Sequence, residues 1–196
     1  MQILRVATDH RLEILRAAAS LFASKPFHEV LMEDVAAASG IAKGTVYRFY
    51  QNKEELYSAI VFDIVAKHIA KLEGILLHTQ GCQKQIECLV RCSVDHYREH
   101  WDFFRVMQRS SLSMLGDPKF LAMRRGLREI YAEVIREGQK QGLWSGPAPA
   151  LSADMTLGMM RNLLVYGDPK LSAKEVSDAI LDVLLHGLSR SRKKEA

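Results

Sequence analysis

Four side chains that could contact nucleic acid follow Gly40 at close spacing: Lys43, Thr45, Tyr47 and Arg48. A Lys or Arg side chain can pair with a phosphate or with a guanine edge, and a Tyr hydroxyl can donate to a phosphate oxygen. A Thr side chain can contact a phosphate or a thymine methyl group. Lys53 adds a cation where a helix is expected to begin, and helix N-termini attract anions. These residue types at this spacing favour a contact with duplex DNA.

Two short helices separated by a tight corner would position these side chains. We expect helices at about 32–39 and 43–50, with Gly40 ending the first in a left-handed conformation. Ile41 and Val46 are expected to fill the core between them. This is the pattern of a helix-turn-helix, which lays its second helix across the major groove. The alternative is a short helix in an ordinary bundle, with Tyr47 and Tyr50 buried.

The apolar spacing predicts an all-α fold of about nine helices. The other helices are expected at about 9–24, 53–78, 83–99, 101–112, 118–140, 151–165 and 172–190. The helix at 9–24 is expected to bury Leu12, Leu15, Ala18 (or Ala19) and Phe22. Asn52 is expected to cap the helix at 53–78, with Glu55 as its capping-box partner.

The overall charge supports an anionic partner only weakly. The net charge is +4, but residues 1–57 hold seven basic and seven acidic residues, so the DNA hypothesis depends on where particular residues lie. The chain contains no run of about 18 apolar residues and no signal peptide at its start. Its three cysteines form no CxxC pair. We therefore expect a cytoplasmic protein that does not enter a membrane.

Cysteine and histidine recur every four residues at Cys88, Cys92, His96 and His100, which raises the possibility of metal binding or thiol sensing. Twelve residues of helix rise about 18 Å, whereas zinc ligands lie about 2.0–2.3 Å from the ion. Only neighbouring pairs could therefore share an ion, with further ligands from elsewhere. We predict no metal and no cofactor, with the thiols in the core and the histidines at its edge, and keep metal or redox sensing as the alternative.

The C-terminal two-thirds of the chain predicts a ligand pocket and a dimer interface. Aromatic and Met side chains suit an adaptable apolar pocket, although plain core is the alternative. The predicted pocket residues are His96, Tyr97, Trp101, Phe104, Met107, Gln108 and Met123. The last two helices are apolar on more than one side, which favours a twofold homodimer over a buried pair in a monomer. The predicted interface residues are Met159, Leu163, Ile180, Val183, Leu184 and Gly187.

Residues 11–57 resemble the N-terminal domain of the tetracycline-repressor (TetR) family of transcription regulators. The matching segments are RLEILRAAASLF, EDVAAASGIAKGTVYRFY and NKEELY, in that order and spacing. The resemblance implies a helix-turn-helix DNA-binding domain at 1–52 and a helical ligand-binding and dimerisation domain at 53–196. It also implies that Lys43, Thr45, Tyr47 and Arg48 carry the recognition helix and that Lys53 holds phosphate.

The sequence departs from the family pattern at three positions: Pro26, Leu31 and Ala42. Leu31 and Ala42 replace hydroxyl residues that cap helices, and each lost cap bond is worth about 1 kcal/mol. We therefore expect modest DNA affinity, or a different group that caps the helix at 32–39.

These features predict a homodimeric, ligand-responsive transcriptional repressor, released from a palindromic double-stranded operator by a small apolar molecule. The alternative is a helical small-molecule-binding protein or enzyme with a vestigial DNA-binding domain. The sequence contains no HExxH, no GxSxG and no Gly-rich phosphate loop, so we do not expect an enzyme.

Overall fold

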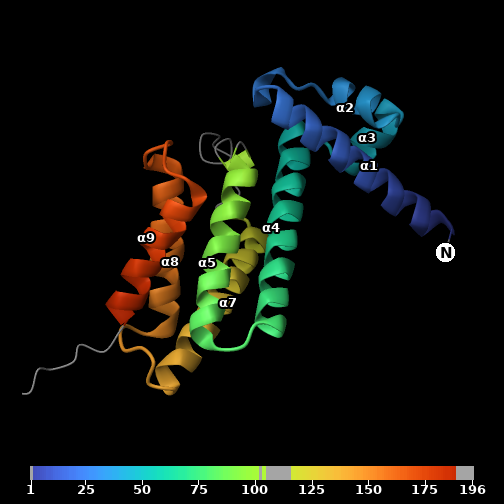
Figure 1. Ribbon diagram of the computed structural model, residues 1–196. Coiled ribbons are helices and arrows are strands. Elements are labelled where there is room, and N and C mark those ends of the chain that lie inside the picture. The colour runs from blue at the N-terminus through green and yellow to red at the C-terminus, as the bar shows by residue number, and fades with distance from the viewer. Residues whose placement is uncertain (1, 102, 105–115, 189–196) are drawn as a thin grey trace, which may run out of the picture. The chain divides into compact units, whose positions relative to one another are not determined.

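The chain is helical throughout the part that the structure describes. A computed structural model describes residues 2–101, 103–104 and 116–188, with side chains from residue 10 to residue 186 of those ranges. Within them lie eight α-helices and one 3-10 helix, and no strand (Figure 1). The all-α prediction is confirmed. The helix expected at about 101–112 falls mostly outside the described residues.

The helices follow the predicted order. They are α1 (Gln2–Ser24), α2 (Met32–Ser39), α3 (Lys43–Phe49), α4 (Lys53–His78), α5 (Cys82–Glu99), α7 (Pro118–Lys140), α8 (Pro149–Tyr166) and α9 (Ala173–Leu188), with the 3-10 helix η1 at Phe27–Glu29. Most bounds agree with the sequence within two residues. The exception is α1, which begins at Gln2 and not near Asp9, since no Pro or Gly interrupts residues 2–8.

The chain divides into two compact units. The N-terminal unit comprises Met1–Val65 and Trp101–Gly116, and the C-terminal unit comprises Ala66–His100 and Asp117–Ala196. Helix α4 therefore contributes its first half to one unit and its second half to the other. The functional boundary expected after residue 52 stays a prediction.

The core of the N-terminal unit is built on one face of α1. Ile14, Ala18 and Phe22 are buried at four-residue steps. Leu12, which the sequence placed on this face, is 42% exposed, so that prediction is wrong. Residue 12 lies about 200° around the helix from residue 14, and the buried stripe begins at residue 14.

An aromatic cluster closes the far end of α1. The rings of Phe22 and Phe27 stack with centroids 5.5 Å apart, and the ring of Tyr57 packs edge-on against both, at 5.1 and 5.2 Å. The Tyr57 hydroxyl donates to the carbonyl oxygen of Phe103 at 2.6 Å. This cluster joins α1, η1 and the first turns of α4.

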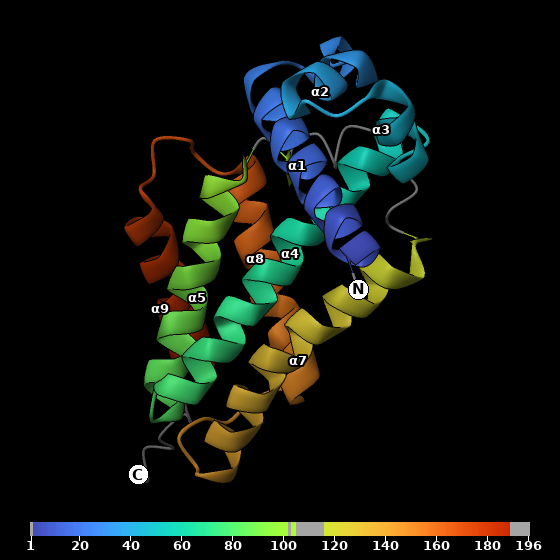
Figure 2. The ribbon, with the colours of Figure 1, turned by 90° about the vertical axis from the view of Figure 1, so that its right-hand side faces the viewer.

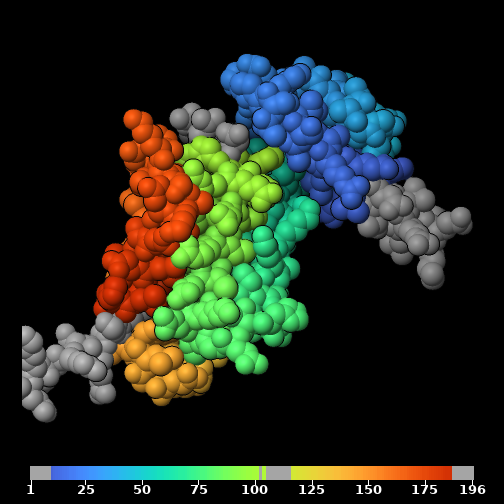
Figure 3. Space-filling model, in the orientation of Figure 1, coloured from blue at the N-terminus to red at the C-terminus, as the bar shows by residue number. Residues whose placement is uncertain are grey.

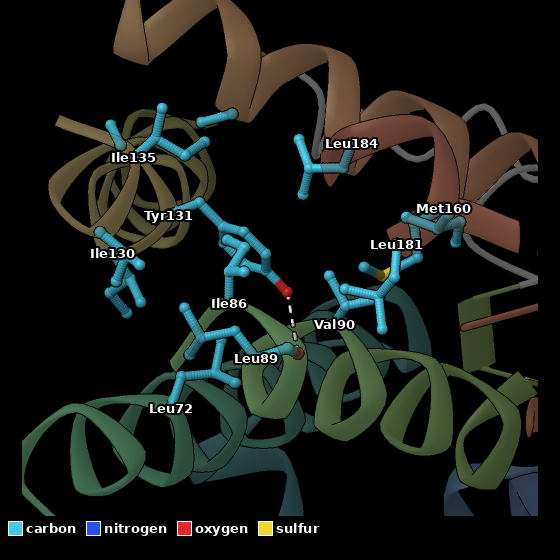
Figure 4. Close-up of a cluster of buried hydrophobic side chains, with 14 of the residues drawn as sticks. Leu72, Ile86, Leu89, Val90, Ile130, Tyr131, Ile135, Met160, Leu181 and Leu184 are labelled. Atoms are coloured by element: carbon cyan, nitrogen blue, oxygen red, sulfur yellow. Dashed lines mark hydrogen bonds between the residues drawn. The ribbon is translucent and has the colours of Figure 1, made fainter. Parts of the chain in front are cut away.

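The core of the C-terminal unit lies among α5, α7, α8, α9 and the second half of α4. Figure 4 shows Tyr131 of α7 among Leu72, Ile86 and Leu89, with its hydroxyl donating to the Leu89 carbonyl oxygen at 2.9 Å. The same hydroxyl lies 2.8 Å from Ser93 Oγ. Burial raises the pKa of Tyr131, so the phenol stays protonated and available to donate.

Helix α7 crosses and packs against α8 (Figure 2), and α9 packs beside α5 (Figure 3). Fully buried Ala132 of α7 and Ala153 of α8 belong to the same core cluster. No described helix is long and apolar enough to cross a membrane.

The end of α7 folds back on itself around two glycines. Gly142 takes a left-handed conformation with a φ of 73°, and the backbone N–H of Leu143 donates to the carbonyl oxygen of Gly138 at 2.9 Å. This turn lays the ring of Trp144 directly on Gly138. A Cβ atom at residue 138 would lie 2.3 Å from Cε3 of that ring.

We expect Gly138→Ala to destabilise the protein by about 1–3 kcal/mol, because the added methyl group must displace the buried Trp144 ring. Gly126→Ala is the matched control on the same helix: a Cβ there meets nothing within 4 Å, so it is expected to stabilise by up to about 1 kcal/mol. Urea unfolding of both variants measures the difference. Equal stability of the two variants would contradict the packing of Trp144 on Gly138.

Candidate nucleic-acid interface

Helix α2 begins without a capping side chain, and a carboxylate takes over part of that role. Leu31 occupies the N-cap position, and its backbone N–H donates to Asp34 Oδ2 at 3.3 Å. Asp34 is thus the other capping group that the sequence left open. Lys25 Nζ lies 3.9 Å from the same carboxylate oxygen. The start of α2 is therefore held through Asp34 despite the apolar residue at its cap.

The corner between α2 and α3 is fixed by backbone conformation and by one buried side chain. Gly40 has a φ of 67°, a left-handed conformation that a residue with a Cβ adopts at a cost. The N–H of Ile41 donates to the Ala36 carbonyl oxygen at 3.2 Å, and the Ile41 side chain is buried. The predicted turn at Gly40 is confirmed.

Helix α3 buries only part of its surface. Val46 is fully buried, and Tyr50 at the C-cap is 3% exposed, with its hydroxyl accepting from Arg11 Nε at 3.3 Å. Tyr47 is 37% exposed, so the alternative that placed both tyrosines in the core holds for Tyr50 alone. Ala42 gives α3 no side-chain cap.

The four predicted contact residues of α3 are therefore placed unequally. Lys43, Tyr47 and Arg48 are exposed, whereas Thr45 is half-buried. The Arg48 guanidinium carbon lies 5.6 Å from the centroid of the Phe49 ring, in cation–π range. Lys43, Tyr47 and Arg48 together form an exposed polar face of α3, and Val46 anchors the opposite side of this helix in the core.

Glu33 of α2 compensates the charge of Lys43, a pairing that was not predicted from the sequence. Lys43 Nζ lies 2.6 Å from Glu33 Oε1 and 5.9 Å from the centroid of the Tyr47 ring. The hydrogen bond between them lowers the pKa of Glu33 and raises the pKa of Lys43. Glu33 lies ten positions before Lys43, so only the crossing of α2 and α3 brings them together. A phosphate at Lys43 would have to compete with this carboxylate.

Lys53 opens α4, but its side chain turns back onto η1. Its Nζ donates to the His28 carbonyl oxygen at 3.3 Å and lies 4.6 Å from the centroid of the Phe27 ring. Asn52 Oδ1 accepts from the Glu55 N–H at 2.8 Å, so the predicted cap is confirmed. Glu55 completes it on the N–H of Gln51, one residue earlier than a standard capping box. A phosphate contact by Lys53 stays a prediction.

The predicted pocket residues fall in both units. In the C-terminal unit, His96 is buried, and Tyr97 and Met123 are half-buried. In the N-terminal unit, Trp101 is half-buried and Phe104 is buried. Met107 and Gln108 lie outside the described residues. An open groove of about 490 Å³ on the C-terminal unit is lined by other residues, among them Arg91, Trp144 and Asp178.

His96 was predicted to lie at the edge of the core. Its ring contacts the rings of two other histidines, His68 and His100. The ring of His68, from α4, stacks on the ring of His96 with centroids 4.1 Å apart and an angle of 8°. His68 Nε2 lies 2.9 Å from Ser93 Oγ. Burial lowers the pKa of His68 to about 4 and that of His96 to about 3, so both rings are neutral at neutral pH.

The predicted dimer residues also divide. Ile180 and Leu184 are 1% and 5% exposed and belong to the protomer's own core, so little of their surface is left for an interface. The four-residue spacing of apolar side chains in α9 does not indicate which of its two apolar faces packs into the core of the protomer. Val183 is 56% exposed, and Met159 and Leu163 are half-buried. Gly187 lies beyond residue 186, the last residue whose burial the structure describes.

Further apolar side chains, which the predicted interface did not include, are exposed on α8. Leu151 and Met155 are each 53% exposed, and Tyr166 is 77% exposed. The number of large apolar side chains on α8 could have indicated these exposed positions, because one face of a helix cannot bury so many of them in its own core.

Two family models match the chain. One, for bacterial regulatory proteins of the TetR family, matches residues 14–60. The other, for a tetracycline repressor-like C-terminal domain, matches residues 80–188. The first match contains α2, the corner and α3, so the exposed face of α3 lies inside it.

Individual proteins resemble the chain over nearly its whole length. It is 22% identical to the HTH-type transcriptional repressor KstR2 of Mycobacterium tuberculosis over 192 residues, covering 93% of this chain and 94% of that protein. The solved structure of the TetR-family regulator PfmR from Thermus thermophilus matches with a TM-score of 0.70 and 26% identity, over 90% and 99% of the two chains. FadR of Bacillus subtilis, solved with stearoyl-CoA, matches with a TM-score of 0.74 and 21% identity, over 90% and 98%.

We expect Glu33→Gln to strengthen binding to duplex DNA by about three- to tenfold at low salt, because it leaves Lys43 without its carboxylate. The plot of log affinity against log salt should steepen by up to about one unit, as for one more phosphate contact. Fluorescence anisotropy with a labelled duplex measures both. Glu73→Gln makes the same charge change on the exposed surface of α4 in the C-terminal unit and serves as control. Equal gains in both variants would show that net charge alone is responsible.

Proposed function

The chain belongs to the TetR family of bacterial regulatory proteins, and we propose that it is a homodimeric transcriptional repressor that a small apolar ligand releases from a palindromic operator. The observation that carries this proposal is the exposed face of α3. Lys43, Tyr47 and Arg48 face solvent, while Val46 anchors the opposite side of the same helix in the core.

In the proposed complex α3 lies in the major groove. Arg48 is the side chain best suited to a bidentate contact with a guanine, since its guanidinium is exposed and forms no ion pair with any residue that the structure describes. Tyr47 donates its hydroxyl to a phosphate oxygen, and Thr45 contacts the adjacent backbone or a thymine methyl. Lys43 exchanges Glu33 for a phosphate. Residues 1–52 would act as the DNA-binding domain.

A dimer would present two such helices to one face of the DNA. Half-sites one helical turn apart place recognition helices about 34–36 Å apart, so a twofold protein requires a palindromic operator. We place the interface on the outward faces of α8 and α9. Val183 and Met155 are exposed apolar members of this surface, and Met159 and Leu163 are half-buried.

The ligand is proposed to bind in the C-terminal domain and to carry an apolar acyl chain. FadR of Bacillus subtilis was solved with stearoyl-CoA, and AibR was solved with isovaleryl coenzyme A and operator DNA. Both share the fold of this chain at 21% and 19% identity. His96, Tyr97 and Met123, the described pocket residues of the C-terminal unit, stay candidates for lining this site. Acyl-coenzyme A thioesters are therefore the first ligand class to test.

We expect Arg48→Ala to weaken binding to a specific operator by about 5- to 150-fold, which corresponds to the loss of one base-reading contact of about 1–3 kcal/mol. The operator is the duplex that the wild-type protein enriches from a random-sequence pool. Arg125→Ala, an equal charge change on the exposed surface of α7, should bind within about twofold of wild type. Failure to enrich any sequence, or equal losses in the two variants, would contradict DNA reading by α3.

We expect saturating stearoyl-CoA to weaken operator binding by about 5- to 150-fold, since allosteric coupling between two sites typically amounts to about 1–3 kcal/mol. Titration of the preformed complex with acyl-CoA thioesters of increasing chain length measures the release. Free coenzyme A is the control for the headgroup and should release little. Release that is independent of the acyl chain would contradict an apolar ligand.

A further inference from the structure

The last turn of α5 gathers three side chains that can ligate a metal ion. His96, Glu99 and His100 lie at positions i, i+3 and i+4, which share one face of a helix. Three ligand atoms, one from each residue, lie within 4.8 Å of one another. The rings of His96 and His100 meet with centroids 4.6 Å apart at an angle of 63°. No other group of three such side chains this close occurs among the described residues.

The distances are near those that one ion requires. Ligand atoms on a tetrahedral zinc ion lie about 3.3–3.5 Å apart when each is about 2.0–2.1 Å from the metal. Side-chain rotation can close a separation of up to 4.8 Å to that value without moving the helix. Glu99 is exposed and His100 is half-buried, so both have room to adjust.

The surroundings hold one ligand firmly and leave another side open. His96 is 8% exposed, and the ring of His68 stacks on it at 4.1 Å. His68 is in turn held by Ser93, whose hydroxyl lies 2.8 Å from the Tyr131 hydroxyl. The stacked His68 ring therefore restricts rotation of the His96 imidazole. The exposed carboxylate of Glu99 leaves the opposite side of the cluster accessible to water.

The local charge also suits a cation. His100 is the C-cap of α5, and the carbonyl groups at a helix C-terminus carry partial negative charge. Lys71 adds a positive charge that acts on the rings of His68 and His96, whereas Glu99 brings a negative charge to the cluster as one of its three ligands. Two imidazoles and one carboxylate are borderline ligands that suit Zn²⁺ and its neighbours, whereas Mg²⁺ and Ca²⁺ prefer oxygen alone.

We propose that His96, Glu99 and His100 bind one divalent transition-metal ion, with Zn²⁺ as the best fit and a fourth position open to water or a ligand. The prediction of no metal came from the length of helix between Cys88 and His100, and it did not consider Glu99. This site does not depend on the proposed binding of DNA, because it uses residues of the C-terminal unit alone.

The test is metal titration of the full-length protein after removal of metal with a chelator and desalting. Isothermal titration with Zn²⁺ should give one ion per protomer, and Co²⁺ should give visible absorption bands that Zn²⁺ abolishes. Glu99→Gln and His100→Ala should each weaken binding at least about tenfold. His186→Ala removes an exposed histidine on α9 and should change nothing.

A folding control for Glu99→Gln and two further variants, Cys92→Ser and Arg48→Ala, make the outcome decisive. Glu99 is exposed, so Glu99→Gln should keep the circular dichroism spectrum and unfolding midpoint of the wild type, and its affinity can be interpreted directly. Cys92→Ser should bind as wild type. No binding by the wild-type protein, unchanged affinity in both Glu99→Gln and His100→Ala, or loss of binding only in Cys92→Ser would overturn the site. Arg48→Ala should bind metal normally even where it fails to bind DNA.

Discussion

A helix of seven residues cannot hold itself together in water, and α3 is such a helix. Its conformation depends on burial of Val46 and on the corner at Gly40, which brings Ile41 into the same core. Because these few residues hold α3 against the core, the exposed positions of α3 are not needed for the stability of the fold. An exposed Arg and Tyr on a fixed backbone are therefore available for recognition. The stability of α1 and α2 beneath α3 is thus a condition for any contact that α3 makes.

Charge within the N-terminal unit is balanced in detail and not only in sum. Lys43 is paired with Glu33, and Lys53 lies over Phe27 with a hydrogen bond to a backbone carbonyl. Lys43 and Lys53, both assigned to DNA from the sequence, thus have partners inside the free protein. Binding of a polyanion must exchange these contacts for phosphate, which lowers non-specific affinity and leaves more of the discrimination to Arg48. Exposed ion pairs are weak, so the exchange is readily reversible.

Local patterns carried most of what the sequence could predict. The Gly40 corner, the buried Val46 and the Asn52 cap each follow from a few neighbouring residues, and the structure places them as expected. Predictions that depend on how the helices pack against one another were less successful. Leu12 and Ile14 are both apolar, and only the packing of α1 decides that Ile14 is buried. Ile180 and Val183 differ in the same way on α9, where one lies in the core and the other is exposed. The pairing of Glu33 with Lys43 and the stacking of His68 on His96 join separate helices, so no spacing rule could find them.

The ring that covers Gly138 has an experimental consequence. The chain contains two tryptophans, Trp101 in the N-terminal unit and Trp144 in the C-terminal unit. Trp144 is 7% exposed, while Trp101 is half-buried. Indole emission responds to contact with water, so each unit contains its own intrinsic optical reporter. Replacing either indole with Phe would leave a protein whose fluorescence follows one unit alone, without any attached dye.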